Sequence, residues 1–90
     1  MIRPAGGPVN DVRVRLFAAA RDAAGTAVDV VAGGDLGSVL ATLRSRYGAE
    51  FIAVLATARV WVNGDEPDAG DATLLQPGDE VAILPPVSGG

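Results

Sequence analysis

The apolar run Val81-Ala82-Ile83-Leu84 is the feature that most constrains how this chain can fold. A continuous apolar run of this length is typical of a strand that is buried on both faces and therefore lies inside a sheet. Pro85 and Pro86 follow directly, and they end the strand because proline has no N–H group to donate to a neighbouring strand. The sequence therefore predicts a central last strand from whose end a short tail departs.

The earlier strand-like segments alternate apolar and polar residues, which is typical of strands with one buried face. These segments are residues 12–17, 26–31 and 59–62. Residues 18–24 are rich in alanine and predict a short helical turn that Gly25 ends. Residues 51–56 are apolar throughout and fit either a short helix or an irregular plug. Asn63-Gly64 predicts a tight hairpin turn, which requires positive φ angles at both positions.

One long helix is predicted after Asp35, whose carboxylate can accept hydrogen bonds from the free N–H groups of a first helical turn. Five apolar side chains then recur at helical spacing and form one stripe: Leu36, Val39, Leu40, Leu43 and Tyr47. Gly48 is the expected end of this helix. We expect the apolar stripe to pack on the sheet.

These elements predict an α+β fold, a small mixed sheet crossed by one main helix. If the first and last strands both belong to the core, they lie side by side and most simply parallel. This is the β-grasp, or ubiquitin-like, arrangement. We divide the chain into a flexible N-terminal extension (residues 1–11), the β-grasp domain (residues 12–84) and an extended, functional C-terminal tail (residues 85–90).

The chain contains no cysteine, histidine or lysine. Thiolate and Ser-His nucleophiles, Schiff-base lysines and zinc sites of the usual Cys/His kind are therefore excluded, and we expect no bound metal or cofactor. Seven arginines against eleven acidic residues give a net charge of −4, which argues against nucleic-acid binding and suits a partner with a basic docking surface. We find no apolar run of membrane-spanning length and no secretory signal, so we expect a cytoplasmic protein without membrane contact.

Three further motifs are interpreted as structural. Gly33-Gly34 before a helix is reminiscent of a phosphate-binding loop, but Asp35 would repel an anion and no lysine follows. Asp79 and Glu80 are adjacent carboxylates without a second catalytic group, so we interpret them as turn and strand-start charges. Trp61 is a conceivable anchor for a partner, although partial cover by a loop is the simpler interpretation.

The tail Pro85-Pro86-Val87-Ser88-Gly89-Gly90 combines a stiff spacer with a narrow tip. The prolines hold the backbone extended, and the glycines have no Cβ, so another protein's narrow channel can admit the tip and reach its carboxylate. Fully extended, six residues reach roughly 20 Å at most. The alternative is an inert, disordered end or a linker remnant. Because the tail follows a predicted central strand in a chain without Cys, His or Lys, we favour a functional tail.

Several short motifs are shared with a known family. They are Leu16-Phe17-Ala18, Arg21-Asp22, Gly25, Val62-Asn63-Gly64, Thr73, Leu75, Gly78-Asp79-Glu80-Val81 and the tail itself. In these motifs the chain resembles the small subunit of molybdopterin synthase, the MoaD-like sulfur carriers of the MoaD/ThiS family. The resemblance covers residues 12–90 and is most specific over the last thirteen. The chain departs from the family by its N-terminal extension and by an alanine-rich first turn, where bulkier residues are common.

The resemblance implies a mechanism in which the chain is no enzyme on its own. A MoeB-like, E1-like adenylating enzyme would use ATP to activate the carboxylate of Gly90, which would then become a thiocarboxylate. The tail would insert into the large catalytic subunit of molybdopterin synthase and donate its sulfur to a cyclic pterin precursor of molybdopterin.

The resemblance also implies a role for each tail residue. Gly90 would carry the reacting atom and Gly89 would give clearance in the channel. Ser88 and Val87 would supply backbone hydrogen bonds and a small apolar contact. Pro85-Pro86 would lower the ordering entropy on insertion.

Two questions stay open at this point. Phe17 and Leu84 are candidates for a hydrophobic docking patch by motif match, and their alternative is a plain place in the core. The function also has alternatives: a sulfur carrier for thiamine or cysteine biosynthesis, a ubiquitin-like protein modifier, or an interaction module with an inert tail.

Overall fold

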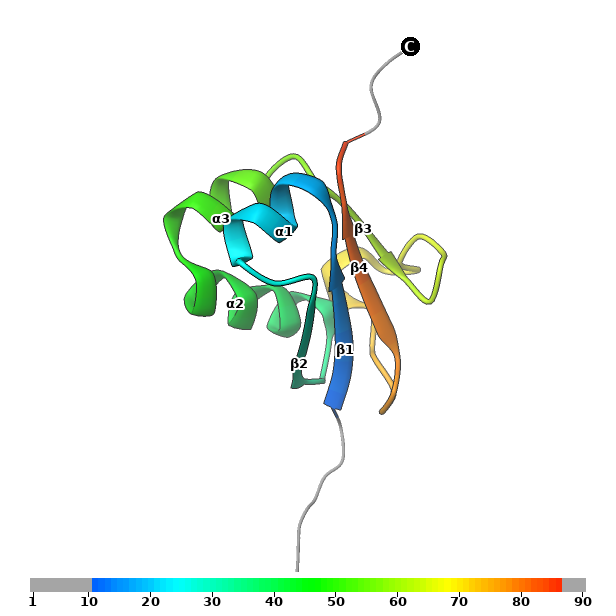
Figure 1. Cartoon of the computed structure of the whole chain (residues 1–90). Helices are drawn as coiled ribbons and strands as arrows, with labels where there is room; N and C mark the ends of the chain where they lie inside the picture. The colour runs from blue at the N-terminus through cyan, green and yellow to red at the C-terminus, as the bar shows by residue number, and fades with distance from the viewer. Residues whose placement is uncertain (1–10, 87–90) are drawn as a thin grey trace, which may run out of the picture.

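Four strands form one mixed sheet in the computed structural model, which describes residues 11–86 (Figure 1). The strands are β1 (Asp11–Leu16), β2 (Val28–Ala32), β3 (Arg59–Val62) and β4 (Glu80–Leu84). The helices are α1 (Ala18–Ala24), α2 (Leu36–Tyr47), α3 (Ala49–Leu55) and the short 3₁₀ helix η1 (Gly70–Ala72). The predicted α+β arrangement is confirmed, and the undecided segment 51–56 belongs largely to a helix that begins at Ala49.

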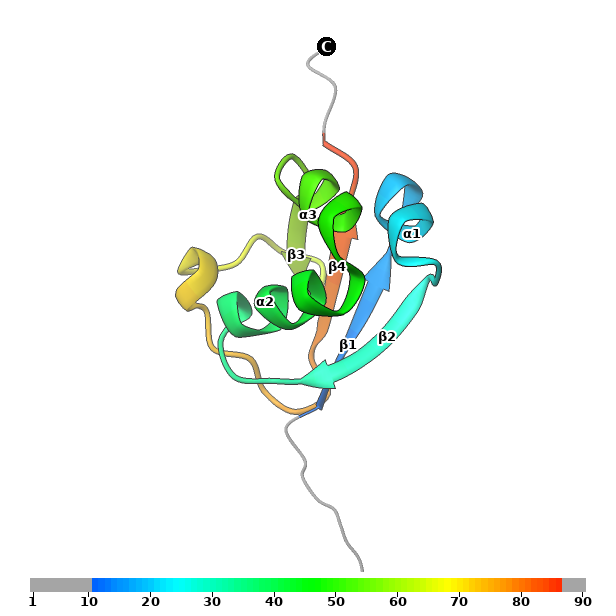
Figure 2. The same cartoon turned by 90° about the vertical axis from the view of Figure 1, so that its left-hand side faces the viewer.

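The first and last strands lie side by side in the middle of the sheet, whose order is β2-β1-β4-β3. β1 and β4 pair in parallel, with Val14 opposite Val81 and Leu16 opposite Ile83. β2 and β3 pair antiparallel on the outer sides of β1 and β4. The prediction of a central last strand is therefore confirmed, and the chain leaves β4 from the middle of the sheet (Figures 1 and 2).

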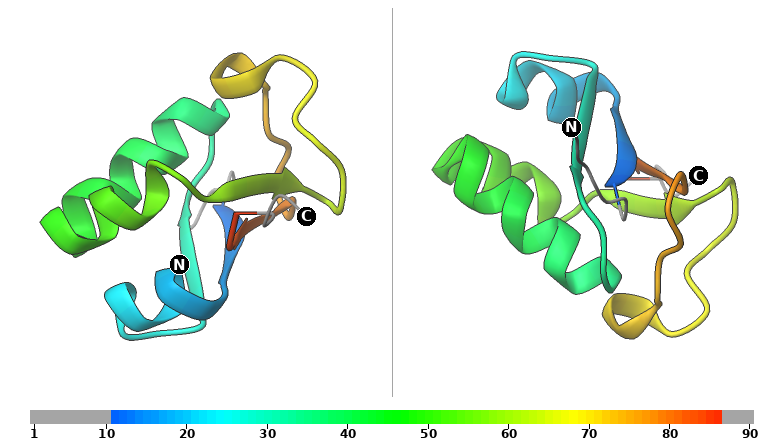
Figure 3. Two further views of the ribbon diagram at one scale, coloured as in Figure 1. Left: turned by 90° about the horizontal axis from the view of Figure 1, so that it is seen from above. Right: turned by 90° about the horizontal axis from the view of Figure 1, so that it is seen from below.

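The prediction that this strand is buried on both faces is wrong. Val81 and Ile83 of β4 are fully buried, whereas Ala82 and Leu84 are only half-buried. The three α-helices all lie on one face of the sheet, and within residues 11–86 no helix covers the other face (Figures 2 and 3). Ala82 and Leu84 belong to this open face, so the continuous apolar run reflects one core face and one apolar surface.

The main helix forms as predicted. The Asp35 carboxylate accepts a hydrogen bond from the Ser38 N–H at 2.8 Å, which satisfies a free donor of the first turn of α2. The stripe residues Leu36, Val39, Leu40 and Leu43 are buried against the sheet. The fifth stripe residue, Tyr47, packs at the edge of this core.

Tyr47 belongs to a polar cluster that ties the end of α2 to β2. Arg46 donates hydrogen bonds from Nη1 to both carboxylate oxygens of Asp29, at 2.9 and 2.8 Å, and the Tyr47 hydroxyl donates to the same carboxylate. Burial raises the pKa of Asp29, but the hydrogen bonds from Tyr47, Arg46 and the Val30 N–H together outweigh it and hold that pKa below its usual value. Burial also raises the pKa of Tyr47, and the bond to Asp29 and its charge raise it further, to about 12.

This shift predicts a loss of stability at high pH. Since the folded state holds the Tyr47 proton more tightly than the ordinary pKa of 10.0 would, its contribution is complete below that pH and is lost as the pH rises through about 12. The chain has one tyrosine and neither lysine nor cysteine, so tyrosinate absorbance can be assigned to one group. We expect a titration midpoint near 12 in the folded protein, a normal midpoint in denaturant, and no such loss of stability in Tyr47→Phe. A folded-state midpoint near the ordinary value would show that the Tyr47 hydroxyl does not donate to Asp29 in solution.

The hairpin predicted at Asn63-Gly64 is present, with φ angles of +52° and +85°. Val62 and Asp65 close the turn by exchanging backbone hydrogen bonds at 2.8 and 3.0 Å. The Asn63 side chain accepts from the Glu80 N–H at 2.9 Å and donates to Asp79 Oδ1 at 3.0 Å. One asparagine thus joins the hairpin to the turn that precedes β4.

Replacing Asn63 separates its two contributions. Asn63→Gly keeps the positive φ but removes both side-chain hydrogen bonds, so we expect the free energy of unfolding to fall by about 1–2 kcal/mol. Asn63→Ala adds backbone strain, which costs roughly 1 kcal/mol more. Urea denaturation of both variants measures the difference, and equal stabilities would show that the backbone conformation contributes nothing.

Candidate functional site

The tail leaves the sheet at the end of β4, beside α1 and α3 (Figures 1 and 2). Pro85 and Pro86 are exposed there. The other four predicted tail residues, Val87, Ser88, Gly89 and Gly90, lie outside the described residues. The site that can be described is therefore the surface around the root of the tail.

An apolar groove of about 150 Å³ opens beside the tail root, between α1, α3 and the end of β4. It is lined by Phe17, Ala18, Ala19, Ala20, Val54, Thr57, Ala58, Leu84, Pro85 and Pro86. The structure thus brings Phe17 and Leu84, the two predicted docking residues, to one groove. Phe17 is 36% exposed and Leu84 is half-buried, so neither has the fully buried position of a plain core residue.

Phe17 is positioned by the two central strands. Its N–H donates to the Ile83 carbonyl at 3.1 Å, and its own carbonyl accepts from the Ala20 N–H at 3.1 Å as α1 begins. The Arg15 guanidinium lies 5.8 Å from the centre of the Phe17 ring, within the range of a cation–π contact. Phe17 therefore connects β1, β4 and α1 at the rim of the groove.

Small side chains leave the groove hollow. Ala18, Ala19 and Ala20 come from the alanine-rich start of α1. Ala18 has a φ of +51°, in the left-handed region that costs a residue with a Cβ on the order of 1 kcal/mol. The sequence carries no signal for this backbone conformation, since alanine is a helix former.

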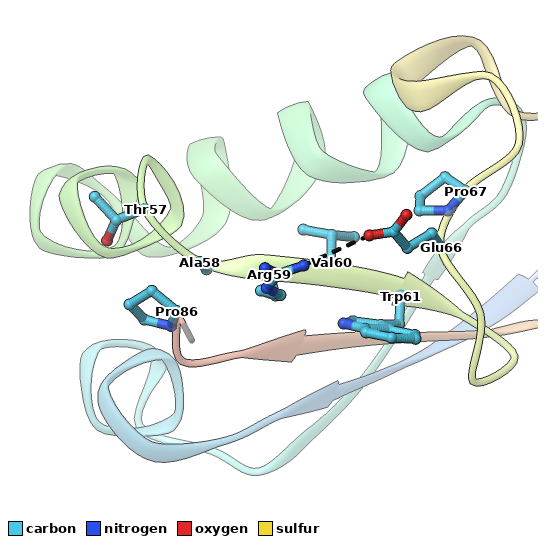
Figure 4. A pocket seen from close by; sticks show the side chains of 8 residues that line it. All are labelled: Thr57, Ala58, Arg59, Val60, Trp61, Glu66, Pro67 and Pro86. Carbon is cyan, nitrogen blue, oxygen red and sulfur yellow. Dashed lines mark hydrogen bonds and ion pairs between the residues drawn. The ribbon is translucent and has the colours of Figure 1, made fainter. Parts of the chain in front are cut away.

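A second, more polar groove of about 440 Å³ lies on the other side of the tail root, along β3. Figure 4 shows Arg59 between Pro86 and Trp61, with Glu66 opposite Arg59. The Arg59 guanidinium is 3.5 Å from the Glu66 carboxylate, and both side chains are well exposed. Trp61 is half-buried and shares the groove with the loop residues Glu66 and Pro67, in agreement with the predicted partial cover.

Sequence reasoning missed Arg59. The available signal was the alternation of residues 59–62, which places Arg59 and Trp61 on the same side of their strand. The alternation does not predict that the loop with Glu66 and Pro67 returns along β3. This return forms the groove.

Asp79 and Glu80 have the structural roles predicted for them. Asp79 accepts from the Gln76 N–H at 2.8 Å within its turn, and Glu80 lies 3.7 Å from Arg15 on the neighbouring strand. Arg21 and Asp22 form a loose, exposed pair at 3.9 Å. Among residues 11–86 no three His, Cys, Asp or Glu side chains are grouped to hold a metal ion, and no helix is long and apolar enough to cross a membrane.

Comparison with known proteins places these features in a family. The model of the ThiS family matches residues 14–90, which include nearly all of the described domain and the whole tail. The chain belongs to the ThiS family. The resemblance to MoaD/ThiS proteins stated above is confirmed.

Relatives of this ThiS-family chain include a molybdopterin synthase sulfur carrier subunit of Drosophila erecta. It is 37% identical over 92 residues, which cover 96% of this chain and 98% of the relative. Among solved structures, small archaeal modifier protein 1 of Methanosarcina acetivorans matches with a TM-score of 0.80 and 33% identity, covering 93% of this chain and 100% of that one. A chain from the complex of subunits 1 and 2 of the molybdopterin-converting factor of Helicobacter pylori matches with a TM-score of 0.68 and 26% identity. The match covers 89% of this chain and 99% of that one. The predicted ubiquitin-like β-grasp fold is thereby confirmed.

Proposed function

We propose that this chain is the sulfur carrier subunit of a molybdopterin synthase. The carboxylate of Gly90 is adenylated with ATP by a MoeB-like enzyme, converted to a thiocarboxylate, and inserted into the large catalytic subunit. There its sulfur passes to the cyclic pterin precursor. The chain itself is a covalent co-substrate that holds no cofactor.

The observation that carries this proposal is the similarity to a protein named as such a carrier over almost the full length of both chains. The family match continues through Gly90, the residue whose carboxylate would react. The composition agrees with this chemistry. With no cysteine, lysine or histidine, the chain has no strong side-chain nucleophile that could intercept its own activated carboxylate.

The experiment that tests the proposal is an intact-mass measurement. The protein is incubated with ATP, a MoeB-like enzyme and a sulfur source, and the expected product has one oxygen of Gly90 replaced by sulfur. Omission of ATP is the control. An unchanged mass under conditions in which a known carrier is converted would refute the proposal.

Docking of the large subunit is proposed to use the apolar groove at the tail root. Phe17 offers an exposed ring at its rim, and an apolar side chain from the partner would fill it. Phe17→Ser is expected to weaken binding of the large subunit roughly tenfold, since Phe17 is only 36% exposed and binding would add about 1.5 kcal/mol, the low end for burial of a large apolar side chain. Ile52→Ser on α3 is the control, because Ile52 is similarly exposed but does not line the groove. Equal effects of both variants on binding would show that the groove is not part of the docking surface.

A second candidate function is protein modification. It is favoured by the similarity to small archaeal modifier protein 1, because the match covers 100% of the length of that modifier. In this case Gly90 would be joined to lysines of other proteins. Peptides that carry a Gly-Gly remnant on lysine, recovered from cells that express the chain, would support it.

A further inference from the structure

The hairpin after β3 places an asparagine directly before a glycine, Asn63-Gly64, and both residues are exposed. The side-chain amide of asparagine is thermolabile. A following glycine makes it most susceptible, because glycine has no Cβ to hinder attack by its own backbone nitrogen on the amide. The chain contains no other Asn-Gly pair. The tip of this hairpin is therefore where the chain loses an amide most readily.

The reaction needs neither an enzyme nor a cofactor. The Gly64 nitrogen gives up its proton and bonds to Cγ of Asn63, the bond from Cγ to the side-chain nitrogen breaks, and ammonia leaves. Water then opens the cyclic imide at either carbonyl and produces aspartate or isoaspartate. Access is open, since a Cβ built on Gly64 would meet nothing within 4 Å. Within residues 11–86 the Gly64 N–H is not engaged in any hydrogen bond.

The fold holds the Asn63 amide away from this reaction. Oδ1 accepts from the Glu80 N–H at 2.9 Å, and Nδ2 donates to Asp79 Oδ1 at 3.0 Å. The backbone N–H of Asn63 donates to the Glu80 carbonyl at 2.8 Å. Ring closure has to turn Cγ towards the Gly64 nitrogen, and this rotation breaks both side-chain hydrogen bonds. The reaction therefore requires that the hairpin first opens away from the start of β4.

The product of the reaction cannot restore these bonds. A carboxylate has no N–H to donate, so at position 63 it would face the Asp79 carboxylate across a contact of 3.0 Å. Like charges at this distance repel. The hollow beside the hairpin, of about 260 Å³, is already lined by four acidic residues: Asp65, Glu66, Asp68 and Asp79. Within residues 11–86 only Glu66 of these has an arginine partner, Arg59.

We propose that Asn63 is a site of spontaneous deamidation controlled by the fold. The closed hairpin protects the amide, whereas an opened hairpin loses it and afterwards closes less tightly. Asn63 joins the hairpin to the start of β4, the central strand from which the tail departs. The modification therefore accumulates, irreversibly, on molecules whose sheet has loosened beside that strand. The proposal is independent of the chemistry of the tail.

The rate of deamidation in the folded and the unfolded chain is the first test. Intact mass and peptide mapping follow the full chain at mildly alkaline pH, and an isoaspartate-specific methyltransferase labels the branched product. We expect the reaction at Asn63 to be roughly tenfold slower in the folded protein than in urea, because two hydrogen bonds must break first. A peptide of residues 60–67, measured in both solvents, corrects for the effect of urea on the chemistry.

A change at Asp79 tests the hydrogen bonds themselves. Asp79→Ala removes the acceptor of the Asn63 amide, so deamidation of the folded chain should become about tenfold faster. Asp68→Ala is the matched control, because it removes a carboxylate from the same hollow but no hydrogen bond to Asn63. Its rate should stay within twofold of that of the unmodified chain.

The product can also be made directly. Asn63→Asp should lower the urea midpoint of unfolding, because it brings two carboxylates together. Adding Asp79→Asn should restore the midpoint, since residue 79 then donates the hydrogen bond and position 63 accepts it. The new amide still has an oxygen for the Gln76 N–H, which Asp79 Oδ2 accepts from at 2.8 Å.

Three results would overturn the proposal. They are equal corrected rates in the folded and the unfolded chain, equal rates for Asp79→Ala and Asp68→Ala, and an unchanged urea midpoint for Asn63→Asp. If Asp79→Ala does not fold, the rates of the unmodified chain and the midpoints of the Asn63→Asp variants decide the question.

Discussion

Deletion of Gly90 is expected to reduce sulfur transfer to background while leaving the fold unchanged. The deletion leaves a terminal carboxylate on Gly89, so the chemical group is retained and only its position changes. One residue of extended backbone corresponds to about 3.5 Å. Since a misplacement of about 1 Å in an active site already costs roughly 100-fold in rate, a carboxylate this far short of the reacting position should not react.

The carrier is first converted to its thiocarboxylate. Conversion of a pterin precursor by the large subunit is then followed over a single turnover. Insertion of one glycine after Gly90 is the companion variant, because it moves the carboxylate by the same distance in the other direction and should fail equally. Arg44→Ala, on the surface of α2, is expected to keep full activity. Normal transfer by the chain lacking Gly90 would show that the tail acts only as a tether.

The strands and the main helix could be predicted because each depends on a local pattern. The alternation of residues 12–17 and the stripe from Leu36 to Tyr47 each have a clear period. The helix ends are marked by the capping carboxylate of Asp35 and by the glycines Gly25 and Gly48. The central place of β4 was also predictable, since its apolar run differs from every other strand.

What the sequence did not contain is which face of the sheet the helices cover. Ala82 and Leu84 are as apolar as Val81 and Ile83, and only the packing of α1, α2 and α3 on one side separates them into surface and core. A surface kept apolar for a partner and a strand buried on both faces produce the same sequence pattern. The candidate site shows the same limit: Phe17 and Leu84 were found through the family motifs, but the groove also needs Val54 from α3, whose place no local pattern gives.

The charged residues of β1 show what alternation can and cannot predict. It sends Arg13 and Arg15 to the same side of the sheet, together with Asp11. The alternation was visible in the sequence. Its meaning depended on the neighbours, Val28 and Val30, which β2 brings alongside only through antiparallel pairing.

Phe51→Ala is expected to cause the largest loss of stability of any single substitution proposed for this chain. Phe51 is fully buried, and its ring lies 5.3 Å from that of Tyr47, where α3 follows α2. Truncation of a buried phenylalanine costs about 3–5 kcal/mol through lost burial and the cavity left behind. A domain of this size has a total stability of roughly 5–13 kcal/mol, so the variant should lose a large fraction of it.

Ile52→Ala is the matched control, because Ile52 is the next residue of the same helix and is 44% exposed. It should change the free energy of unfolding by no more than about 0.5–1 kcal/mol, since exposed positions rarely contribute more. Urea denaturation followed by Trp61 fluorescence measures both variants. Similar losses at the two positions would mean that α3 contributes through helix formation and not through the core. A large difference would instead assign its contribution to the Phe51 side chain, which anchors α3 in the core and thereby fixes the Val54 wall of the apolar groove.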